Sequence, residues 1–353
     1  KSIGNARWSA DGRHIAFTMG GQIWTAGISE KKGSWKLSDI RQISDIEAGA
    51  GEFKISPDEN MIMYISYVKS HVKSPSDCYE DLDKATAYET DDLMYRHWDH
   101  TVMEIPHTFI ADFAFGMPEK SVTKENSTDI LAAEKELYEL PTEPWSGLEQ
   151  LSWSPDSRFI AYSCRKLAGK KYAFSTNTEI YIYNIETGEC GVVDMKGGYD
   201  TDPVWSPDGS SIAWISMERD GYEADKQRLM VAHVDWSTVK EDGSGVPEVK
   251  YIDNVTGAFK YNASGPVWSD DSKNIYFASL VEGIQGIFRC SLEDNFIYRM
   301  TGEEKWYDFG SPFHIDENED GTTLYTTWCS MDFPTELVAV RCSADETDYT
   351  QIT

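Results

Sequence analysis

Residues 205–214 read Trp-Ser-Pro-Asp-Gly-Ser-Ser-Ile-Ala-Trp, and this stretch decides the fold. Trp205 ends one apolar run. Pro207, Asp208 and Gly209 then turn the chain, because proline presets φ and aspartate and glycine accept turn geometry. The apolar run 212–214 follows at once and is typical of a buried strand. The stretch therefore predicts two antiparallel strands joined by a tight turn.

The same pattern recurs along the chain, starting at Trp8, Ile55, Trp153, Trp205 and Trp268, with a degenerate sixth copy at Ile315. A repeat of about 40 to 60 residues is typical of repeat architectures. Further strand-like runs follow each copy, and most units close on an apolar residue beside a hydroxyl residue, as in 42–44, 299–301 and 351–353. Four short antiparallel strands per repeat make one propeller blade. We therefore predict an all-β fold, a β-propeller with six visible blades and room for a seventh.

One interval is too long for a single blade. Ile55 and Trp153 lie 98 residues apart, so this interval holds either a further blade with a weak pattern or an insertion. The propeller pattern stops at Lys69 and resumes with a strand over 109–113. We expect a non-propeller insertion at about 69–107 within a single domain that spans residues 1–353.

The composition excludes several partners. The chain has 60 acidic and 32 basic residues and a formal charge of −28. Nucleic acid needs basic side chains to neutralise its phosphates. Anionic membrane surfaces would also repel this acidic chain, so we expect neither nucleic acid nor a membrane as a partner. No stretch approaches the length of a transmembrane segment. The six cysteines are best interpreted as buried apolar residues, and we expect no metal and no cofactor.

The insertion carries a dense group of candidate site residues. Arg96, His97, Trp98, Asp99 and His100 follow one another directly. An indole flanked by carboxylates suits a cationic or peptide group. The alternative is a loop that Trp98 pins to the propeller. A zinc site from His97, His100 and His107 is a weaker alternative, because no neighbouring carboxylate has the required spacing.

A second candidate site is the charged run 216–226, which joins two predicted strands. A hairpin would need only two to five residues there, and long loops on rigid scaffolds often carry function. The carboxylates of Glu218 and Glu223 suit a free amino terminus. Arg219 suits a peptide carbonyl or carboxylate, and Tyr222 lies between them. Arg165 occupies the matching place one blade earlier, and the alternative is a solvated charged loop.

These segments resemble one family. The repeats look like those of TolB-type propellers and of the N-terminal propellers of the prolyl oligopeptidase family of serine peptidases. The runs 92–99 (DLMYRHWD), 147–156 (GLEQLSWSPD) and 216–226 (SMERDGYEADK) are similar to bacterial acylaminoacyl-peptidases and dipeptidyl-peptidases. The resemblance implies a propeller that gates substrates for a C-terminal α/β-hydrolase domain with a Ser-Asp-His triad.

This chain has no G-x-S-x-G motif, the usual setting of the serine nucleophile in such a domain. We therefore expect the hydrolase domain to be absent from it, and an N-terminal segment to be removed or omitted. The resemblance also implies a peptide substrate, binding of its free amine by propeller carboxylates, and a periplasmic or secreted location. A homo-oligomer is left open. The alternative function is a non-catalytic TolB-like propeller that acts as a protein–protein interaction scaffold.

Overall fold

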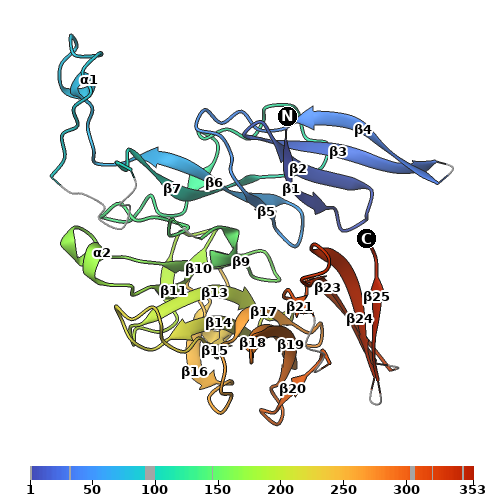
Figure 1. The fold of residues 1–353 in the computed structure, drawn as a ribbon. Coiled ribbons are helices and arrows are strands. Elements are labelled where there is room, and N and C mark those ends of the chain that lie inside the picture. Colours follow the sequence, from blue (N-terminus) through green and yellow to red (C-terminus); the bar gives the residue numbers. More distant parts are fainter. Residues whose placement is uncertain are drawn as a thin grey trace. The chain divides into compact units, whose positions relative to one another are not determined.

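The computed structural model describes residues 2–31, 33–91, 100–144, 146–302, 307–319, 321–343 and 346–353. These residues form six antiparallel sheets with very little helix. Each sheet is built from sequence-adjacent strands, which is the topology of a propeller blade. The fold is therefore a six-bladed β-propeller, as the repeats predict (Figure 1). The chain consists of two compact units, residues 1–150 with 163–176, and residues 151–162 with 177–353.

The first unit holds blades 1 and 2. Blade 1 consists of β1 (Ile3–Trp8), β2 (His14–Met19), β3 (Gln22–Lys31) and β4 (Ser34–Gln42). Blade 2 consists of β5 (Phe53–Ile55), β6 (Met61–Lys69), β7 (Glu104–Asp112) and β8 (Thr128–Asp129). Ala16 and Ile23 of blade 1 share one apolar core with Phe53 and Ile62 of blade 2. The hydrophobic core of this unit therefore lies between its two blades.

Four blades make up nearly all of the second unit. Blade 3 consists of β9 (Leu151–Trp153), β10 (Phe159–Cys164), β11 (Glu179–Asn184) and β12 (Cys190–Val192). Blade 4 consists of β13 (Tyr199–Trp205), β14 (Ser211–Met217), β15 (Arg228–Asp235) and β16 (Glu248–Asn254). Blade 5 consists of β17 (Ser264–Trp268), β18 (Asn274–Val281), β19 (Ile284–Ser291) and β20 (Ile297–Arg299).

The sixth blade follows the pattern least closely, as its degenerate repeat suggests. Two short strands, β21 (Asp308–Phe309) and β22 (His314–Asn318), both pair with β23 (Gly321–Cys329). The sheet then continues through β24 (Glu336–Cys342) and β25 (Thr347–Gln351). The described helices are short: α1 (Pro75–Cys78), α2 (Lys170–Phe174), and two 3₁₀ turns, η1 (Leu148–Gln150) and η2 (Trp236–Thr238). None of them is long and apolar enough to cross a membrane.

The repeated Ser and Asp residues form one hydrogen-bonded arrangement, here called the Ser–Asp turn. In blade 4 the Ser206 hydroxyl donates to Asp208 Oδ1 at 2.6 Å and accepts from the amide of Ser211 at 3.0 Å. Asp208 Oδ1 also accepts from the amide of Ser210 at 2.9 Å. The same three bonds recur at the starts of blades 1, 2, 3 and 5. The turn is thus fixed by side-chain hydrogen bonds as well as by backbone propensity.

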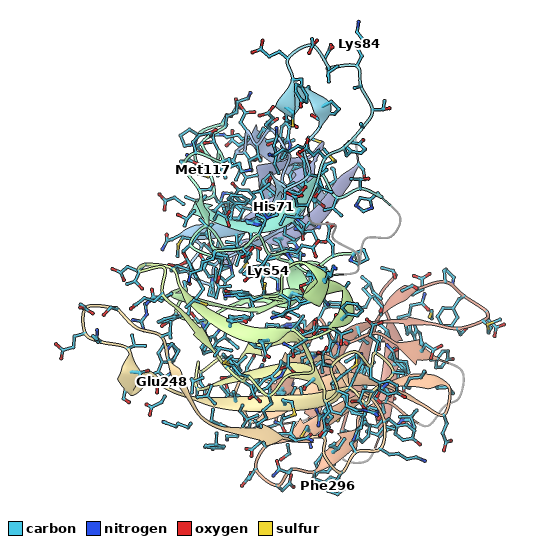
Figure 2. All side chains as sticks on the ribbon, turned by 90° about the vertical axis from the view of Figure 1, so that its left-hand side faces the viewer. Lys54, His71, Lys84, Met117, Glu248 and Phe296 are labelled. Atoms are coloured by element: carbon cyan, nitrogen blue, oxygen red, sulfur yellow. The ribbon has the colours of Figure 1, made fainter. Side chains whose placement is uncertain are left out.

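The long interval between repeats contains an insertion. Among the described residues between Ile55 and Trp153, the only sheet is that of blade 2. Strand β7 begins at Glu104, because its residues 104–107 pair with 66–69 of β6. The described residues between these two strands are 70–91 and 100–103. The described part of the insertion is an arm that carries α1, closed by paired backbone hydrogen bonds between Lys73 and Glu89 (Figure 1). Lys84, labelled in Figure 2, lies at the exposed end of this arm.

The cysteine prediction is largely confirmed. All six cysteines are free thiols, and Cys164, Cys290 and Cys342 are buried, whereas Cys329 is half-buried. Burial raises the pKa of the Cys290 thiol to about 11, so it behaves as a small apolar residue. Cys78 and Cys190 are exposed, so the prediction of burial is wrong for these two cysteines.

Candidate functional site

The charged run predicted as a site forms the loop between β14 and β15, residues 218–227. Arg219 and Asp225 hold its two ends together. The Arg219 guanidinium donates twice to the Asp225 carboxylate at 3.2 Å, and the Arg219 amide donates to it at 3.0 Å. The guanidinium also lies 4.0 Å from the ring centre of Tyr222. The hydrogen bond from Arg219 holds the pKa of Asp225 down at about 2, so this ion pair persists over the whole physiological range.

The other side chains of the loop are anchored to the two neighbouring blades. Glu218 accepts from Arg228 Nη1 at 3.2 Å, and its own side chain remains three-quarters exposed. Asp220 Oδ1 accepts from the backbone amide of Asn177, just before β11, at 3.1 Å. Glu223 is exposed and also has an interaction partner. The structure therefore brings Glu218, Arg219, Tyr222 and Glu223 into one ordered loop.

Arg165 lies in the first unit, directly after β10, and is only 4% exposed. Its guanidinium carbon lies 5.0 Å from the ring centre of Tyr172 on α2. The Tyr172 hydroxyl donates to the buried Glu139, and burial strongly raises its pKa. Arg165 Nε and Nη1 have no hydrogen-bond partner among the residues that the structure describes. A buried guanidinium with unused donors is suited to a carbonyl or carboxylate group.

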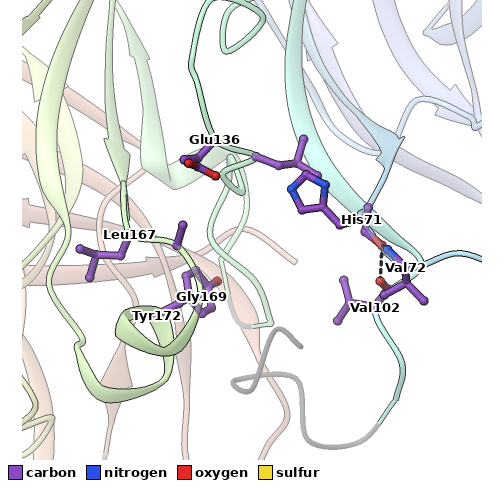
Figure 3. Close-up of a pocket in the computed structure, with 10 residues that line it drawn as sticks. His71, Val72, Val102, Glu136, Leu167, Gly169 and Tyr172 are labelled. Atoms are coloured by element: carbon purple, nitrogen blue, oxygen red, sulfur yellow. Dashed lines mark hydrogen bonds between the residues drawn. The ribbon is translucent and has the colours of Figure 1, made fainter. Parts of the chain in front are cut away.

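A small pocket in the same unit lies near Tyr172 (Figure 3). His71, Val72 and Val102 line one side, and Leu167 and Gly169 are among the residues on the other. Its volume is about 30 Å³, which is space for one or two water molecules and not for a peptide. The sequence does not predict this pocket, and we assign it no ligand.

The candidate residues Arg96, His97, Trp98 and Asp99 lie outside the described residues, so their interpretation stays a prediction. Of the histidines in the zinc alternative, His97 lies outside the described residues and His100 is exposed. His107 is buried, and its Nδ1 lies 2.7 Å from Asp129 Oδ2. Within the ranges that the structure describes, no group of three or more metal-ligating side chains comes together.

Two buried carboxylates lie next to the loop, and sequence reasoning missed both. Glu179 opens β11 and is 8% exposed, and Asp200 near the start of β13 is 5% exposed. Thr178 holds the two strands together, because its hydroxyl donates to the Asp200 carbonyl at 2.6 Å and accepts from the Asp200 amide at 2.9 Å. Asp200 Oδ1 accepts from the indole of Trp214 at 3.0 Å. This pair lies at the junction of blades 3 and 4.

Burial dominates the electrostatics of this pair. Burial raises the pKa of Asp200 to about 7. Hydrogen bonds from Ser216 and Trp214 act in the opposite direction, whereas repulsion from Glu179 and Asp194 raises this pKa further. Burial likewise raises the pKa of Glu179, with a further contribution from Asp194. Both groups therefore resist ionisation unless positive charge is brought near. The neighbouring sequence does not reveal that Glu179 is buried. Glu336 is likewise the first residue of a strand, β24, but it is only half-buried.

Comparisons with known proteins agree with the fold. No family model matches the chain. The chain is 42% identical over 311 residues to dipeptidyl-peptidase 5 of Porphyromonas gingivalis, a match that covers 86% of this chain and 41% of that protein. It is 34% identical over 337 residues to dipeptidyl-peptidase 5 of Porphyromonas endodontalis, covering 95% and 44%. The chain thus spans less than half the length of these relatives.

Solved structures add evidence on the fold alone. The acylaminoacyl peptidase of Pyrococcus horikoshii superposes with a TM-score of 0.59 at 15% identity, covering 99% of this chain and 45% of that one. The chain is thus a β-propeller homologous to part of the dipeptidyl-peptidase 5 proteins, and its fold is similar to that of an acylaminoacyl peptidase.

Proposed function

We propose that this chain is the propeller domain of a serine exopeptidase, in which it admits peptide substrates and recognises their free amino terminus. Its partner in the same protein would be a C-terminal α/β-hydrolase domain, whose Ser-Asp-His triad cleaves the peptide through an acyl-enzyme. The observation that carries this proposal is the 42% identity to a dipeptidyl-peptidase over 86% of the chain. A periplasmic or secreted location stays a prediction.

The geometry of the loop 218–227 supports the recognition part of the proposal. Arg219 is bound to Asp225 and Tyr222, so its role is to hold the loop in shape rather than to meet a substrate carboxylate. Glu218 and Glu223 remain exposed on this ordered loop. Carboxylates on a rigid support attract a cation and need little reorganisation to bind it. Arg165 supplies unused donors for a peptide carbonyl.

Kinetics of the full-length protein test this proposal. Glu218→Ala and Glu223→Ala are each expected to raise KM for a peptide with a free amino terminus. The increase should be at most about fivefold, since exposed ion pairs contribute up to about 1 kcal/mol. Glu293→Ala, an exposed change between β19 and β20, serves as the matched control. Unchanged kinetics in both loop variants would remove the loop from amine recognition.

The source gene beyond the codon for Thr353 tests the partner domain. We expect a continuation of roughly 250 residues with G-x-S-x-G, then Asp, then His, in that order. A stop codon or an unrelated continuation would instead favour a non-catalytic propeller that serves as a scaffold.

A further inference from the structure

The arm inserted into blade 2, residues 70–91, has a defined shape but no core of its own. Paired backbone hydrogen bonds of 2.9 Å join Lys73 and Glu89 at its base, and backbone turns continue from there toward its end. Every residue from 76 to 89 is exposed. A two-stranded segment of this kind is marginally stable by itself in water. Contact with another surface would therefore stabilise the arm.

The arm carries three large exposed side chains that favour such a contact. Tyr79, Leu82 and Tyr88 are 61%, 39% and 56% exposed. Single exposed apolar side chains are normal on a protein surface, whereas several of them together mark interaction sites. Tyrosine is also enriched among the residues that contribute most to binding in protein interfaces. The side chains of the arm are therefore typical of a docking element.

The charge of the arm indicates what kind of surface it binds. The arm holds six carboxylates and two lysines. Among the described residues, Asp77 is the only one of these carboxylates with a basic side chain within 4 Å, and its partner is Lys69 at 4.0 Å. Glu80, Asp81 and Asp83 are exposed. The arm therefore fits a surface that presents basic and apolar side chains together.

Helix α2 presents a surface of this kind. Four of the seven residues 165–171 are basic, in a chain with 60 acidic and 32 basic residues. Lys170 and Lys171 on α2 are exposed, and no acidic side chain of the described residues lies within 4 Å of either ammonium group. Phe174, the last residue of α2, is 81% exposed. The helix therefore offers two cations and an apolar ring to an acidic partner that carries tyrosines.

The arm and α2 are complementary, but they do not pair within one copy. Both belong to the first unit, and His71 at the base of the arm lines the same small pocket as Gly169, just before α2 (Figure 3). The arm then leads away from this pocket, with α1 far from α2 (Figure 1). We propose that the arm of one copy binds α2 of a second copy of this chain, which returns the same contact. This exchange closes a two-fold dimer with two identical contacts.

The net charge of −28 opposes association of two copies only in part. At physiological ionic strength, salt screens exposed charges that lie more than about 8 Å apart. The charges that meet in the contact therefore matter more than the total. Carboxylates of the arm and ammonium groups of α2 attract each other at that range.

Two charge-reversed variants of the full-length protein test the proposal. The arm variant carries Asp81→Lys with Asp83→Lys, and the helix variant carries Lys170→Glu with Lys171→Glu. Analytical ultracentrifugation at physiological salt should show a dimer of the unmodified protein. The dissociation constant of each variant should be higher by about tenfold or more, because both contacts of the dimer then join like charges.

A mixture of the two variants isolates the exchange from general effects of charge. In a mixed pair, the basic arm of one copy meets the acidic α2 of the other, and the acidic arm meets the basic α2. The mixture should therefore form dimers about as tightly as the unmodified protein. Lys31→Glu with Lys36→Glu, exposed on the β3–β4 hairpin, changes the net charge as much as the helix variant does. This control should leave the dissociation constant unchanged.

Three results would overturn the proposal. The unmodified protein could stay monomeric at every concentration, or both variants could dimerise as well as it does, which would place the interface elsewhere. If each variant is monomeric and the mixture is too, the two copies do not exchange arms. Tyr79→Ser with Tyr88→Ser tests the apolar part without a change of charge. It should also raise the dissociation constant by about tenfold or more at an unchanged melting temperature, and an unchanged dissociation constant would exclude the arm from the interface.

Discussion

The Ser–Asp turn shows how much a single residue fixes in this protein. Ser206 is fully buried, and its hydroxyl both donates to Asp208 and accepts from the Ser211 amide. The sequence predicts this turn from Pro207, Asp208 and Gly209, without Ser206. The serine appears in five of the six repeats because its hydroxyl satisfies a buried amide, which turn propensity does not require.

Ser206→Ala is expected to lower the free energy of unfolding by about 1–3 kcal/mol, because it leaves the Ser211 amide and an Asp208 oxygen short of a partner. Chemical denaturation measures this loss. Ser210→Ala removes an exposed hydroxyl bonded to Asp208 in the same turn and should cost less than about 0.5 kcal/mol. Equal effects of the two variants would contradict the role given to the buried serine.

At the level of elements, the strand order within blades follows from the repeats, and the strand ends follow less well. The predicted closing runs of blades 1, 5 and 6 extend past the strands. Nevertheless, Ile43, Met300 and Ile352 still donate backbone hydrogen bonds of 2.8–2.9 Å to the neighbouring third strands. The predicted strand over 109–113 starts later than β7, which begins at Glu104. Residues 104–107 include Pro106 and His107, which interrupt the apolar strand pattern.

The junction between β13 and β14 allows a sharp test. Gly198 precedes β13 with φ of 118°, and a Cβ there would lie 2.2 Å from the Met217 carbonyl oxygen. Gly198→Ala should therefore force the two strands apart and cost more than about 3 kcal/mol. Its melting temperature should be compared with that of Gly12→Ala, where φ is 66° and no heavy atom lies within 4 Å.

The control isolates the clash from the backbone conformation. Gly12→Ala should cost only about 1–2 kcal/mol, the strain of a left-handed conformation without a collision. If the two variants melt at the same temperature, the close approach of β13 to the end of β14 does not limit stability.

At the level of the whole molecule, the acidic groups give opposite dependences of stability on pH. Hydrogen bonds from Ser9 and Ser269 lower the pKa of Asp11 and Asp271, so their contribution is present above about pH 4 and lost as the pH falls further. Burial raises the pKa of Asp200 to about 7, so its contribution is complete below about pH 4 and is lost as the pH rises through 7. Stability should therefore peak at weakly acidic pH.

Melting temperatures between pH 3 and pH 9 test this balance. Asp200→Asn should flatten the decline between about pH 4 and pH 7, because the buried group can no longer ionise. Asp270→Asn, an exposed change in the turn of blade 5, should leave that decline in place. A decline that persists unchanged in Asp200→Asn would show that other groups cause it.

The sequence alone predicted the propeller fold, its repeated blades and the position of the charged loop 216–226. Each turn and its flanking strands rest on residues within about ten positions of one another, and their recurrence every 40 to 60 residues identifies the blades. The tertiary structure alone decided that Arg219 stabilises its loop and that Glu179 and Asp200 are both buried near the junction of blades 3 and 4. Burial and ion pairing depend on contacts between strands that are distant along the chain. The sequence alone therefore cannot show that Glu179 is buried whereas Glu336 is only half-buried.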